Sequence, residues 1–310
     1  MDTDSPLRGV SASGSSVDVS IDAAQREPSH DLNLFGRQLT ASSLWLATVL
    51  GICGLVLCWI FSRHIRAHYA SWSQGWLNPF DAAIMHALNR FADRWLWLNP
   101  IFRAFEEHNL LKGGPVVILC WVAFFQRSGS AAETLERRRK IAATIPLAIF
   151  GVLFARVLAV ILPFRERPLR TVALHFQLPR ILHPSVLYGW SSFPSDHAVL
   201  FVTLAAGLFL ASRPLGILAL LHSFLVVMLL RAYLGIHWPT DLLAGALLGL
   251  ALAGIVTIDA YRNWIWRWVT KCWQSSPGLS AAFIFLLSYE IIDLFGTPIE
   301  IAKSLLKHRL

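Results

Sequence analysis

The sequence predicts an all-α fold: a polytopic membrane bundle of six transmembrane helices, with amphipathic helices at the membrane interface. Apolar residues make up 55% of the 310-residue chain, its mean hydropathy is +0.53, and only 15% of its residues are charged. Long runs carry almost no charge, as membrane spans do. The net charge of +8 comes largely from arginines near these runs. It predicts an anionic bilayer as the partner and disfavours nucleic acid.

Six apolar segments are predicted to cross the membrane, each needing about 20 residues to do so. The second and the fourth are short, so we expect their helices to extend into the flanking polar sequence. The segments are residues 42–61, 110–125, 141–162, 198–211, 215–236 and 242–258.

The loops and ends of the chain predict its orientation. Residues 127–140 hold five basic residues, and short basic loops of this kind remain in the cytoplasm. Six alternating spans then place the loops at 163–197 and around His237 together on the outer face. The N-terminal region is polar and lacks an apolar core, which is typical of disorder. The predicted units are a disordered cytoplasmic tail (1–38), a transmembrane domain (39–260) and a cytoplasmic or interfacial helical tail (261–310).

Two further segments are predicted to lie at membrane surfaces. Residues 63–112 are rich in aromatic side chains and resemble amphipathic helices lying on the outer interface. Residues 280–295 are apolar but include Glu290 and Asp293, so we expect an inner-surface helix there and not a seventh span. The four cysteines lack the spacing of metal ligands, and no glycine-rich nucleotide loop is present. No metal and no cofactor are therefore predicted.

Arginines near the ends of the predicted spans indicate chemistry on a phosphate group. Arg167 and Arg231 are the first candidates for binding it, and Arg165 is a supporting one. A guanidinium stays charged and can hold two phosphate oxygens at once. Phosphoryl transfer depends mainly on such positioning and charge stabilisation.

His237 is the predicted nucleophile. A neutral imidazole can attack phosphorus and form a phosphohistidine that water then hydrolyses. Pro239 favours a helix start directly after His237, which places Asp241 in the first helical turn. We expect the Asp241 carboxylate to accept a hydrogen bond from one imidazole nitrogen and to leave the other free to attack.

His197 is the predicted acid that protonates the leaving group. It follows Ser195 and Asp196 at the start of an apolar run, where free backbone N–H groups favour an anion. The Ser195 hydroxyl can add a further donor. A nearby phosphate favours the protonated form of His197, whereas His237 has to be neutral to attack.

These residues, in this order, resemble the type 2 phosphatidic acid phosphatase (PAP2) and vanadate haloperoxidase superfamily. That family carries Pro-Ser-Gly-His and later Ser-Arg, five residues, His, three residues, Asp. Here the later motif runs from Arg231 through His237 to Asp241, with Leu230 in place of the serine. The earlier motif reads PSDH, with Asp196 in place of the glycine, and SFPSDHA is similar to the bacterial branch that contains undecaprenyl diphosphate phosphatases.

The first motif of the family departs further from the pattern. The family has a lysine, six residues and then Arg-Pro; Arg167 matches, but Val160 stands at the lysine position. Arg156, one helical turn earlier, and Arg165 are both candidates to replace this phosphate ligand.

The resemblance implies a membrane phosphatase that hydrolyses a lipid phosphate or diphosphate through a phosphohistidine, without a metal. We expect it in a bacterial inner membrane, with its site on the periplasmic or extracellular side. Undecaprenyl diphosphate is the leading substrate, and phosphatidic acid, phosphatidylglycerol phosphate and lipid A phosphates stay open. The alternatives are a lipid phosphotransferase, an anion transporter and an inactive phosphatase-like scaffold, the last favoured only by Val160.

Overall fold

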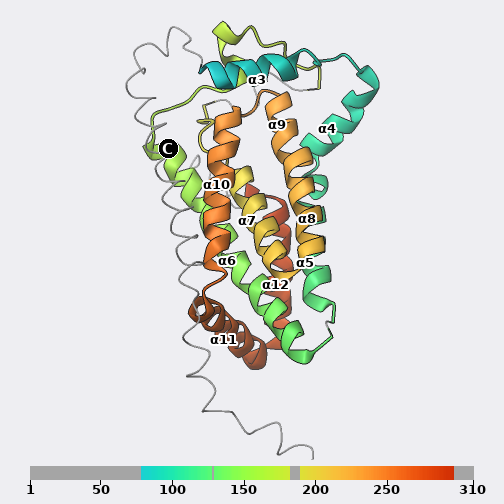
Figure 1. The fold of residues 1–310 in the computed structure, drawn as a ribbon, viewed down its shortest axis with the longest axis vertical. Coiled ribbons are helices and arrows are strands. Elements are labelled where there is room, and N and C mark those ends of the chain that lie inside the picture. Colours follow the sequence, from blue (N-terminus) through green and yellow to red (C-terminus); the bar gives the residue numbers. More distant parts are fainter. Residues whose placement is uncertain (1–77, 128, 182–188, 297–310) are drawn as a thin grey trace, which may run out of the picture. The chain divides into compact units, whose positions relative to one another are not determined.

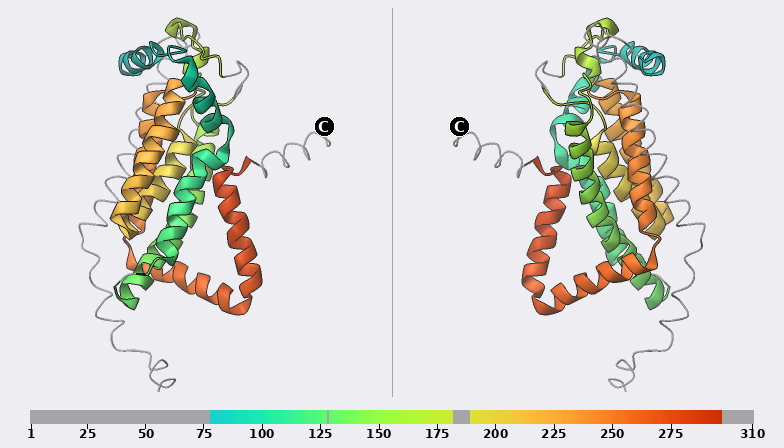
Figure 2. Two further views of the ribbon diagram at one scale, coloured as in Figure 1. Left: turned by 90° about the vertical axis from the view of Figure 1, so that its right-hand side faces the viewer. Right: turned by 90° about the vertical axis from the view of Figure 1, so that its left-hand side faces the viewer.

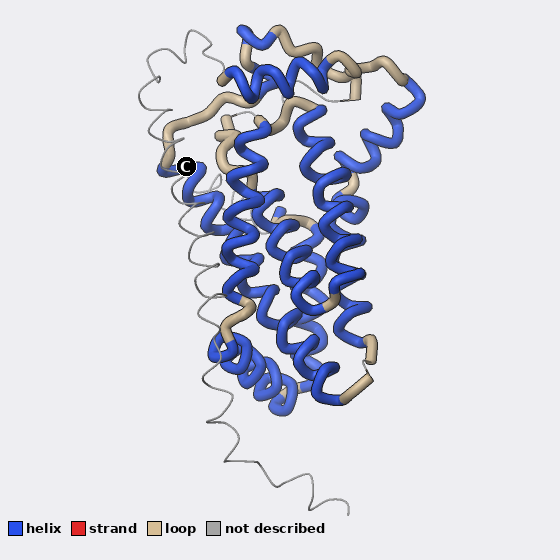
Figure 3. Tube along the Cα trace, in the orientation of Figure 1, coloured by secondary structure: helices blue, strands red, loops and turns tan. Residues whose placement is uncertain are grey.

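The computed structural model describes residues 78–127, 129–181 and 189–296. The chain divides into two units, Met1–Gln38 and Leu39–Leu310, and every described residue belongs to the second. The predicted N-terminal tail and the predicted first span at 42–61 lie outside the described residues. In the described ranges the elements are helices joined by loops, without a strand (Figure 3), which confirms the all-α prediction.

The helices of the second unit form a bundle with one helix across each end. Figure 1 shows α6, α7, α8 and α10 running along the bundle, with α3 across one end and α11 across the other. The end that α3 crosses is called the α3 end below. The helices are α3 (Pro79–Asn89), η3 (Leu96–Leu98), α4 (Asn99–Glu107), α5 (Asn109–Phe125), α6 (Ala131–Ile161), η4 (Pro168–Arg170), η5 (Val172–Leu174), α7 (Asp196–Ala211), α8 (Arg213–His222), the π-helical η6 (Ser223–Leu229), α9 (Leu230–Tyr233), α10 (Pro239–Ile255), α11 (Asp259–Ser275) and α12 (Pro277–Ile292).

Helix α7 forms the centre of the bundle. It is apolar around its whole circumference and packs against α6, α8 and α10, as a fully buried helix does. Gly245 lets α10 approach the start of α7 closely, because a Cβ at this position would lie 2.5 Å from the carbonyl oxygen of Ser195. The starts of α7 and α10 are therefore held against each other at the α3 end.

The described residues include fewer than six candidate membrane spans. Among the described residues, Ala131–Ile161 and Arg213–Tyr233 are long and apolar enough to cross a membrane, and two bent helix pairs raise the number to four. Six spans are not confirmed. Large apolar side chains are exposed along the outer faces of α6 and α8, as expected of helices that face lipid: Phe150, Leu153, Val157, Ile217, Leu218 and Leu221.

Two helix boundaries differ from the predicted ones. The predicted basic loop at 127–140 is mostly helical, because α6 begins at Ala131, where the Ser130 side chain accepts a hydrogen bond from the Glu133 backbone N–H. The predicted span at 215–236 ends earlier, at Tyr233. Gly235 stops the helix there, since its φ of +69° lies in the left-handed region that favours glycine.

The C-terminal helices turn back along the bundle. Figure 2 shows α11 crossing the far end and α12 returning from it. Helix α12 packs against α5, and the Leu294 carbonyl that follows it accepts a hydrogen bond from Arg156 of α6 at 2.7 Å. The predicted inner-surface helix at 280–295 thus contacts the bundle, while its place relative to a membrane stays a prediction.

Candidate functional site

All the predicted site residues are described, and they lie at or near the α3 end. They form two groups. The histidine cluster comprises Arg167, Ser195, His197, Arg231 and His237; the Arg165 cluster comprises Asp81, Arg165, Thr240 and Asp241. The predicted residues come from α6 (Arg156), the loop after it (Arg165 and Arg167), the start of α7 (Ser195 and His197), α9 (Arg231) and the segment that begins α10 (His237 and Asp241).

His237 is buried in the turn between α9 and α10, and a backbone carbonyl orients its ring. Its Nδ1 lies 2.8 Å from the Ser192 carbonyl oxygen. A carbonyl only accepts hydrogen bonds, so Nδ1 carries the hydrogen and Nε2 keeps its lone pair. Burial, together with the charges of Arg167 and Arg231, lowers the pKa of His237 and favours the neutral ring.

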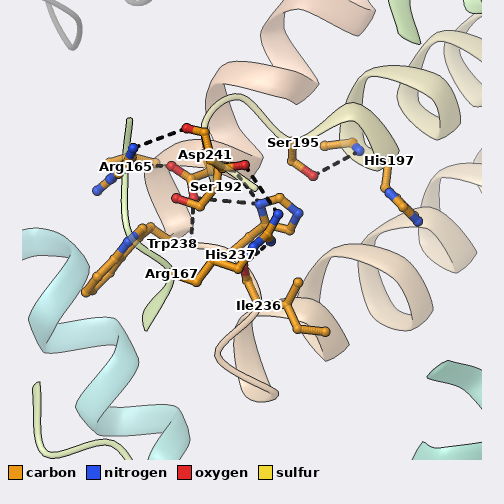
Figure 4. Close-up of polar contacts among 12 residues, drawn as sticks. Arg165, Arg167, Ser192, Ser195, His197, Ile236, His237, Trp238 and Asp241 are labelled. Atoms are coloured by element: carbon orange, nitrogen blue, oxygen red, sulfur yellow. Dashed lines mark hydrogen bonds and ion pairs between the residues drawn. The ribbon is translucent and has the colours of Figure 1, made fainter. Parts of the chain in front are cut away.

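The Asp241 carboxylate has other partners than the sequence predicted. Its nearest oxygen lies 3.7 Å from Nδ1 of His237, beyond hydrogen-bond distance. The same oxygen accepts a 2.8 Å hydrogen bond from the Trp238 backbone N–H at the start of α10, and the other oxygen pairs with Arg165. Asp241 therefore caps α10 and compensates Arg165, while the Ser192 carbonyl takes the predicted place beside the imidazole (Figure 4).

The Arg165 cluster is a buried and fully paired network. Arg165 pairs with Asp241 and donates to the Thr240 hydroxyl at 2.8 Å, and its other Nη donates to Asp81 at 2.6 Å. Asp81 also accepts from the Thr240 backbone and hydroxyl. Because both ends of the guanidinium fork are taken, Arg165 is placed differently from the predicted phosphate ligand and ties α3 to α10.

Arg167 has the free capacity that Arg165 lacks. It is 5% exposed and donates to the carbonyl oxygens of Ile236, at 2.7 Å, and Ser191, at 3.3 Å. Its Nε is buried and has no hydrogen-bond acceptor among the described residues. Burial and the charge of Arg231 lower the pKa of Arg167 to about 10, so the guanidinium remains protonated at neutral pH.

Arg231 contacts the second histidine directly. Its Nη2 lies 2.5 Å from Nε2 of His197, while its Nε is buried without an acceptor among the described residues. Arg231 is 4% exposed, and the nearest carboxylate oxygen, of Glu106, is 3.9 Å from Nη2. A buried cation with unused donors is costly unless an anion compensates it. This part of the site therefore suits a phosphate.

His197 is held in one tautomer by the residue that departs from the family pattern. Its Nδ1 donates to the Asp196 carboxylate at 2.8 Å, and its Nε2 accepts from Arg231. Arg156 pairs with the other Asp196 oxygen at 3.3 Å and with the Leu294 carbonyl. Arg156 is thus engaged in an ion pair, which differs from its predicted role as a phosphate ligand.

Ser195 lies at the contact between α7 and α10. Its side chain accepts a hydrogen bond from the Ala198 backbone N–H and caps α7, and its own N–H donates to the Asp241 carbonyl oxygen. The capping oxygen keeps its hydroxyl hydrogen for donation to a ligand. Ser195 is fully buried.

Two parts of the site were missed from the sequence. Asp81 lies in the first turn of α3, where a carboxylate is usual for a helix start. Only its spacing of four residues from the buried Met85 indicates that it faces inward. The Ser192 contact involves a backbone carbonyl, which residue types do not reveal.

Comparisons with known proteins agree with this geometry. Residues 142–265 match the model of the PAP2 superfamily, and this range holds both histidines and both arginines of the histidine cluster. Helices α3, α4 and α5 lie outside it. No solved structure matches the chain.

Three curated relatives resemble parts of the chain. The bacitracin transport permease protein BcrC of Bacillus licheniformis is 26% identical over 148 residues, 48% of this chain and 71% of that protein. Lipid A 1-diphosphate synthase of Escherichia coli (strain K12) is 25% identical over 207 residues, 64% of this chain and 81% of that protein. Undecaprenyl-diphosphatase of Sulfolobus acidocaldarius is 44% identical over 59 residues, 19% of this chain and 28% of that protein.

Proposed function

The chain belongs to the PAP2 superfamily through residues 142–265, and from this premise we propose that it is an integral membrane phosphatase that hydrolyses a lipid diphosphate through a phosphohistidine. Undecaprenyl diphosphate is the best candidate substrate, in keeping with the name of a relative 44% identical over 59 residues. The proposed site opens on the periplasmic or extracellular side of a bacterial inner membrane.

One observation carries this proposal. Two buried arginines with unused Nε donors, Arg167 and Arg231, lie in the same cluster as His237, whose tautomer leaves Nε2 with a lone pair. Arg167 donates at 2.7 Å to the carbonyl oxygen of Ile236, the residue before His237, and the His237 backbone N–H donates to the Arg231 carbonyl oxygen at 3.4 Å. Cations that bind and polarise a phosphate, next to a neutral imidazole, are what attack on phosphorus requires.

In the first step, His237 Nε2 attacks the phosphorus that Arg167 and Arg231 hold. A bond forms between Nε2 and phosphorus, and the bond from phosphorus to the leaving oxygen breaks. The Ser192 carbonyl holds the hydrogen on Nδ1 and stabilises the positive charge that develops on the ring. Ser195, at the start of α7, donates to a phosphate oxygen.

His197 delivers the proton to the leaving oxygen. The substrate phosphate draws the Arg231 fork away from His197, so that Nε2 becomes able to carry a proton. Asp196, kept ionised by Arg156, stabilises this imidazolium through Nδ1. In the second step His197 takes a proton from water, and the water oxygen bonds to phosphorus. The bond from phosphorus to Nε2 of His237 then breaks, which releases phosphate and restores His237.

A lipid phosphotransferase is the second candidate. A relative that matches over 207 residues is named for the synthesis of a diphosphate, lipid A 1-diphosphate. The same phosphohistidine would pass its phosphate to a lipid phosphate in place of water. Radiolabelled phosphate found on an added acceptor lipid and not in solution would identify this activity.

Phosphate release by the detergent-purified protein tests the proposal. The substrates are undecaprenyl diphosphate, phosphatidic acid and phosphatidylglycerol phosphate, each measured with a chelator present. His237→Ala is expected to lower release by roughly three orders of magnitude or more, as loss of a covalent nucleophile does. His86→Ala, an exposed histidine of α3, is the matched control and keeps wild-type activity.

Each outcome of this experiment has a distinct meaning. Release that persists in chelator and disappears in His237→Ala supports a metal-independent histidine mechanism. Release that the chelator abolishes contradicts the metal-independent part. No release from any lipid contradicts the phosphatase proposal and favours the scaffold or the transporter.

A further inference from the structure

Two charged side chains at the bend between α4 and α5 belong to no predicted motif. The two helices meet at 66°, with Glu106 near the end of α4 and Lys112 in the first turn of α5. Lys112 is 5% exposed, and its Nζ donates to the Glu106 backbone carbonyl at 2.6 Å. Its own carbonyl contacts Nε2 of His222 at 2.9 Å. The position of this lysine is therefore fixed from both sides.

This bend is joined to the histidine cluster. Glu106 Oε1 lies 3.9 Å from Lys112 Nζ and also 3.9 Å from Arg231 Nη2, so the two cations are separated by less than twice that distance. Arg231 in turn lies 2.5 Å from Nε2 of His197. Lys112 is thus on the same side of the cluster as Arg231 and His197.

Neither cation at this bend has a carboxylate oxygen within hydrogen-bond distance among the described residues. Glu106 Oε1 lies 3.9 Å from both Lys112 Nζ and Arg231 Nη2, and Asp293 adds a second negative charge near Lys112. Buried cations without full compensation favour an additional anion. Lys112 therefore places a second incompletely paired cation next to Arg231.

We propose that Lys112 binds the second phosphate of a diphosphate substrate, that Arg231 bridges the two phosphates, and that Glu106 positions the lysine. The inference rests on the proposed phosphatase function and sets its substrate class. His237 Nε2 bonds to the terminal phosphorus, the bond from that phosphorus to the bridging oxygen breaks, and the oxygen leaves on the lipid monophosphate. Lys112 stabilises the negative charge that remains on this leaving phosphate.

The location of Val160 agrees with a cation supplied from another helix. Val160 occupies the lysine position of the first motif and is 79% exposed on α6. Arg156 and Arg165, the two predicted replacements, are taken up by ion pairs. Lys112 comes from α5, outside the residues that match the family, and for this reason motif comparison does not find it.

Lys112→Met tests the inference, because it keeps the length of the side chain and removes the charge. We expect kcat/KM for undecaprenyl diphosphate to fall at least about tenfold more than kcat/KM for phosphatidic acid, since one charge-assisted contact is lost only with the diphosphate. Lys112→Arg is expected to restore most of the difference. Lys140→Met is the matched control, because Lys140 is also partly buried and donates to a backbone carbonyl, that of Leu210, away from the site.

A soluble probe gives an independent readout. Methylenediphosphonate is expected to inhibit phosphatidic acid hydrolysis by the wild-type protein more strongly than phosphate does, and Lys112→Met is expected to remove most of this preference. Equal losses for both lipids, or an unchanged preference for the probe, would show that Lys112 only caps α4 and would overturn the inference alone. Wild-type protein that releases phosphate from phosphatidic acid but not from the diphosphate would also overturn it, while no release from either lipid would contradict the phosphatase function itself.

Discussion

Two buried arginines at the same end of the bundle, Arg165 and Arg231, differ in what compensates their charge. Arg165 is 7% exposed and Arg231 is 4% exposed, so burial does not separate them. The Arg165 fork meets two carboxylates and a hydroxyl within hydrogen-bond distance. Arg231 meets an imidazole nitrogen at 2.5 Å, a carboxylate only at 3.9 Å, and no acceptor at Nε among the described residues.

This difference distinguishes an arginine that holds the fold together from arginines that can bind a ligand. A buried cation whose donors are all paired with the protein holds helices together, as Arg165 does between α3 and α10. A buried cation with unused donors can bind an anionic ligand, and we propose that Arg231 and Arg167 bind a phosphate. Residue type and burial alone would assign Arg165 the same role as Arg231 and Arg167.

The largest expected effect is on stability and follows from breaking the Arg165 cluster. Arg165→Met leaves Asp81 and Asp241 buried without a counter-charge, and removing one partner of such a pair costs about 3–5 kcal/mol in the free energy of unfolding. Chemical unfolding in detergent measures it. Arg103→Met, which breaks an exposed pair with Glu107, is the control and should cost about 1 kcal/mol or less. Equal small losses in both variants would contradict a structural role for Arg165.

The next effect is on activity and follows from removing Arg231. Arg231→Gln is expected to lower kcat/KM about 10²–10³-fold, as loss of a donor to developing charge does, with little change in melting temperature. Arg213→Gln, at the far start of the same helical segment and exposed, is the control and retains activity. If Arg231→Gln instead unfolded the protein while its folded fraction kept full kcat/KM, the comparison would fail.

Replacing Ser195 is expected to have a smaller effect, which falls on both stability and activity. Ser195→Ala removes a helix cap worth about 1 kcal/mol of stability and the hydroxyl donor to phosphate, so kcat/KM should fall by roughly tenfold. Ser130→Ala removes the equivalent cap of α6 at the opposite end and should lower only stability. Matching losses of stability with no difference in kcat/KM would limit Ser195 to capping.

The smallest effect is a displacement of the pH profile. Burial lowers the pKa of His237 below the usual value of about 6.5. The attacking ring has to be neutral, so the acid limb that His237 contributes to the kcat/KM profile should lie below pH 6.5, at the lowered pKa. A kcat/KM profile measured between pH 4 and pH 8 checks this. An acid limb centred at or above 6.5 would contradict the account.

The sequence was sufficient to predict the all-α fold, and it singled out the residues that the structure brings together in the histidine cluster. Charged residues at the ends of apolar runs are rare and therefore informative. The spacing from Arg231 to His237 and Asp241 predicted that these residues lie around the start of one helix. The partners of these residues did not follow from spacing. Asp81 and Lys112 come from α3 and α5, and only tertiary packing brings them to the site.

The roles within the charged groups were the least predictable. Arg165 was predicted to support Arg167, and Arg156 and Arg165 were the candidates to replace the missing lysine, but both meet carboxylates in the fold. Asp241 was expected to accept a hydrogen bond from one imidazole nitrogen of His237, whereas in the structure the Ser192 carbonyl lies beside Nδ1. Residue type indicates which groups carry charge, whereas the compensating contacts depend on side chains far apart along the chain.

Trapping the covalent intermediate tests the central claim most directly. The purified protein is mixed with undecaprenyl diphosphate carrying a radiolabelled terminal phosphate, quenched in alkali within one turnover, digested and sequenced by mass spectrometry. The account predicts an acid-labile phosphate on His237 that is absent in His237→Ala. Label on His197 or on another residue, or turnover without any labelled protein, would contradict it.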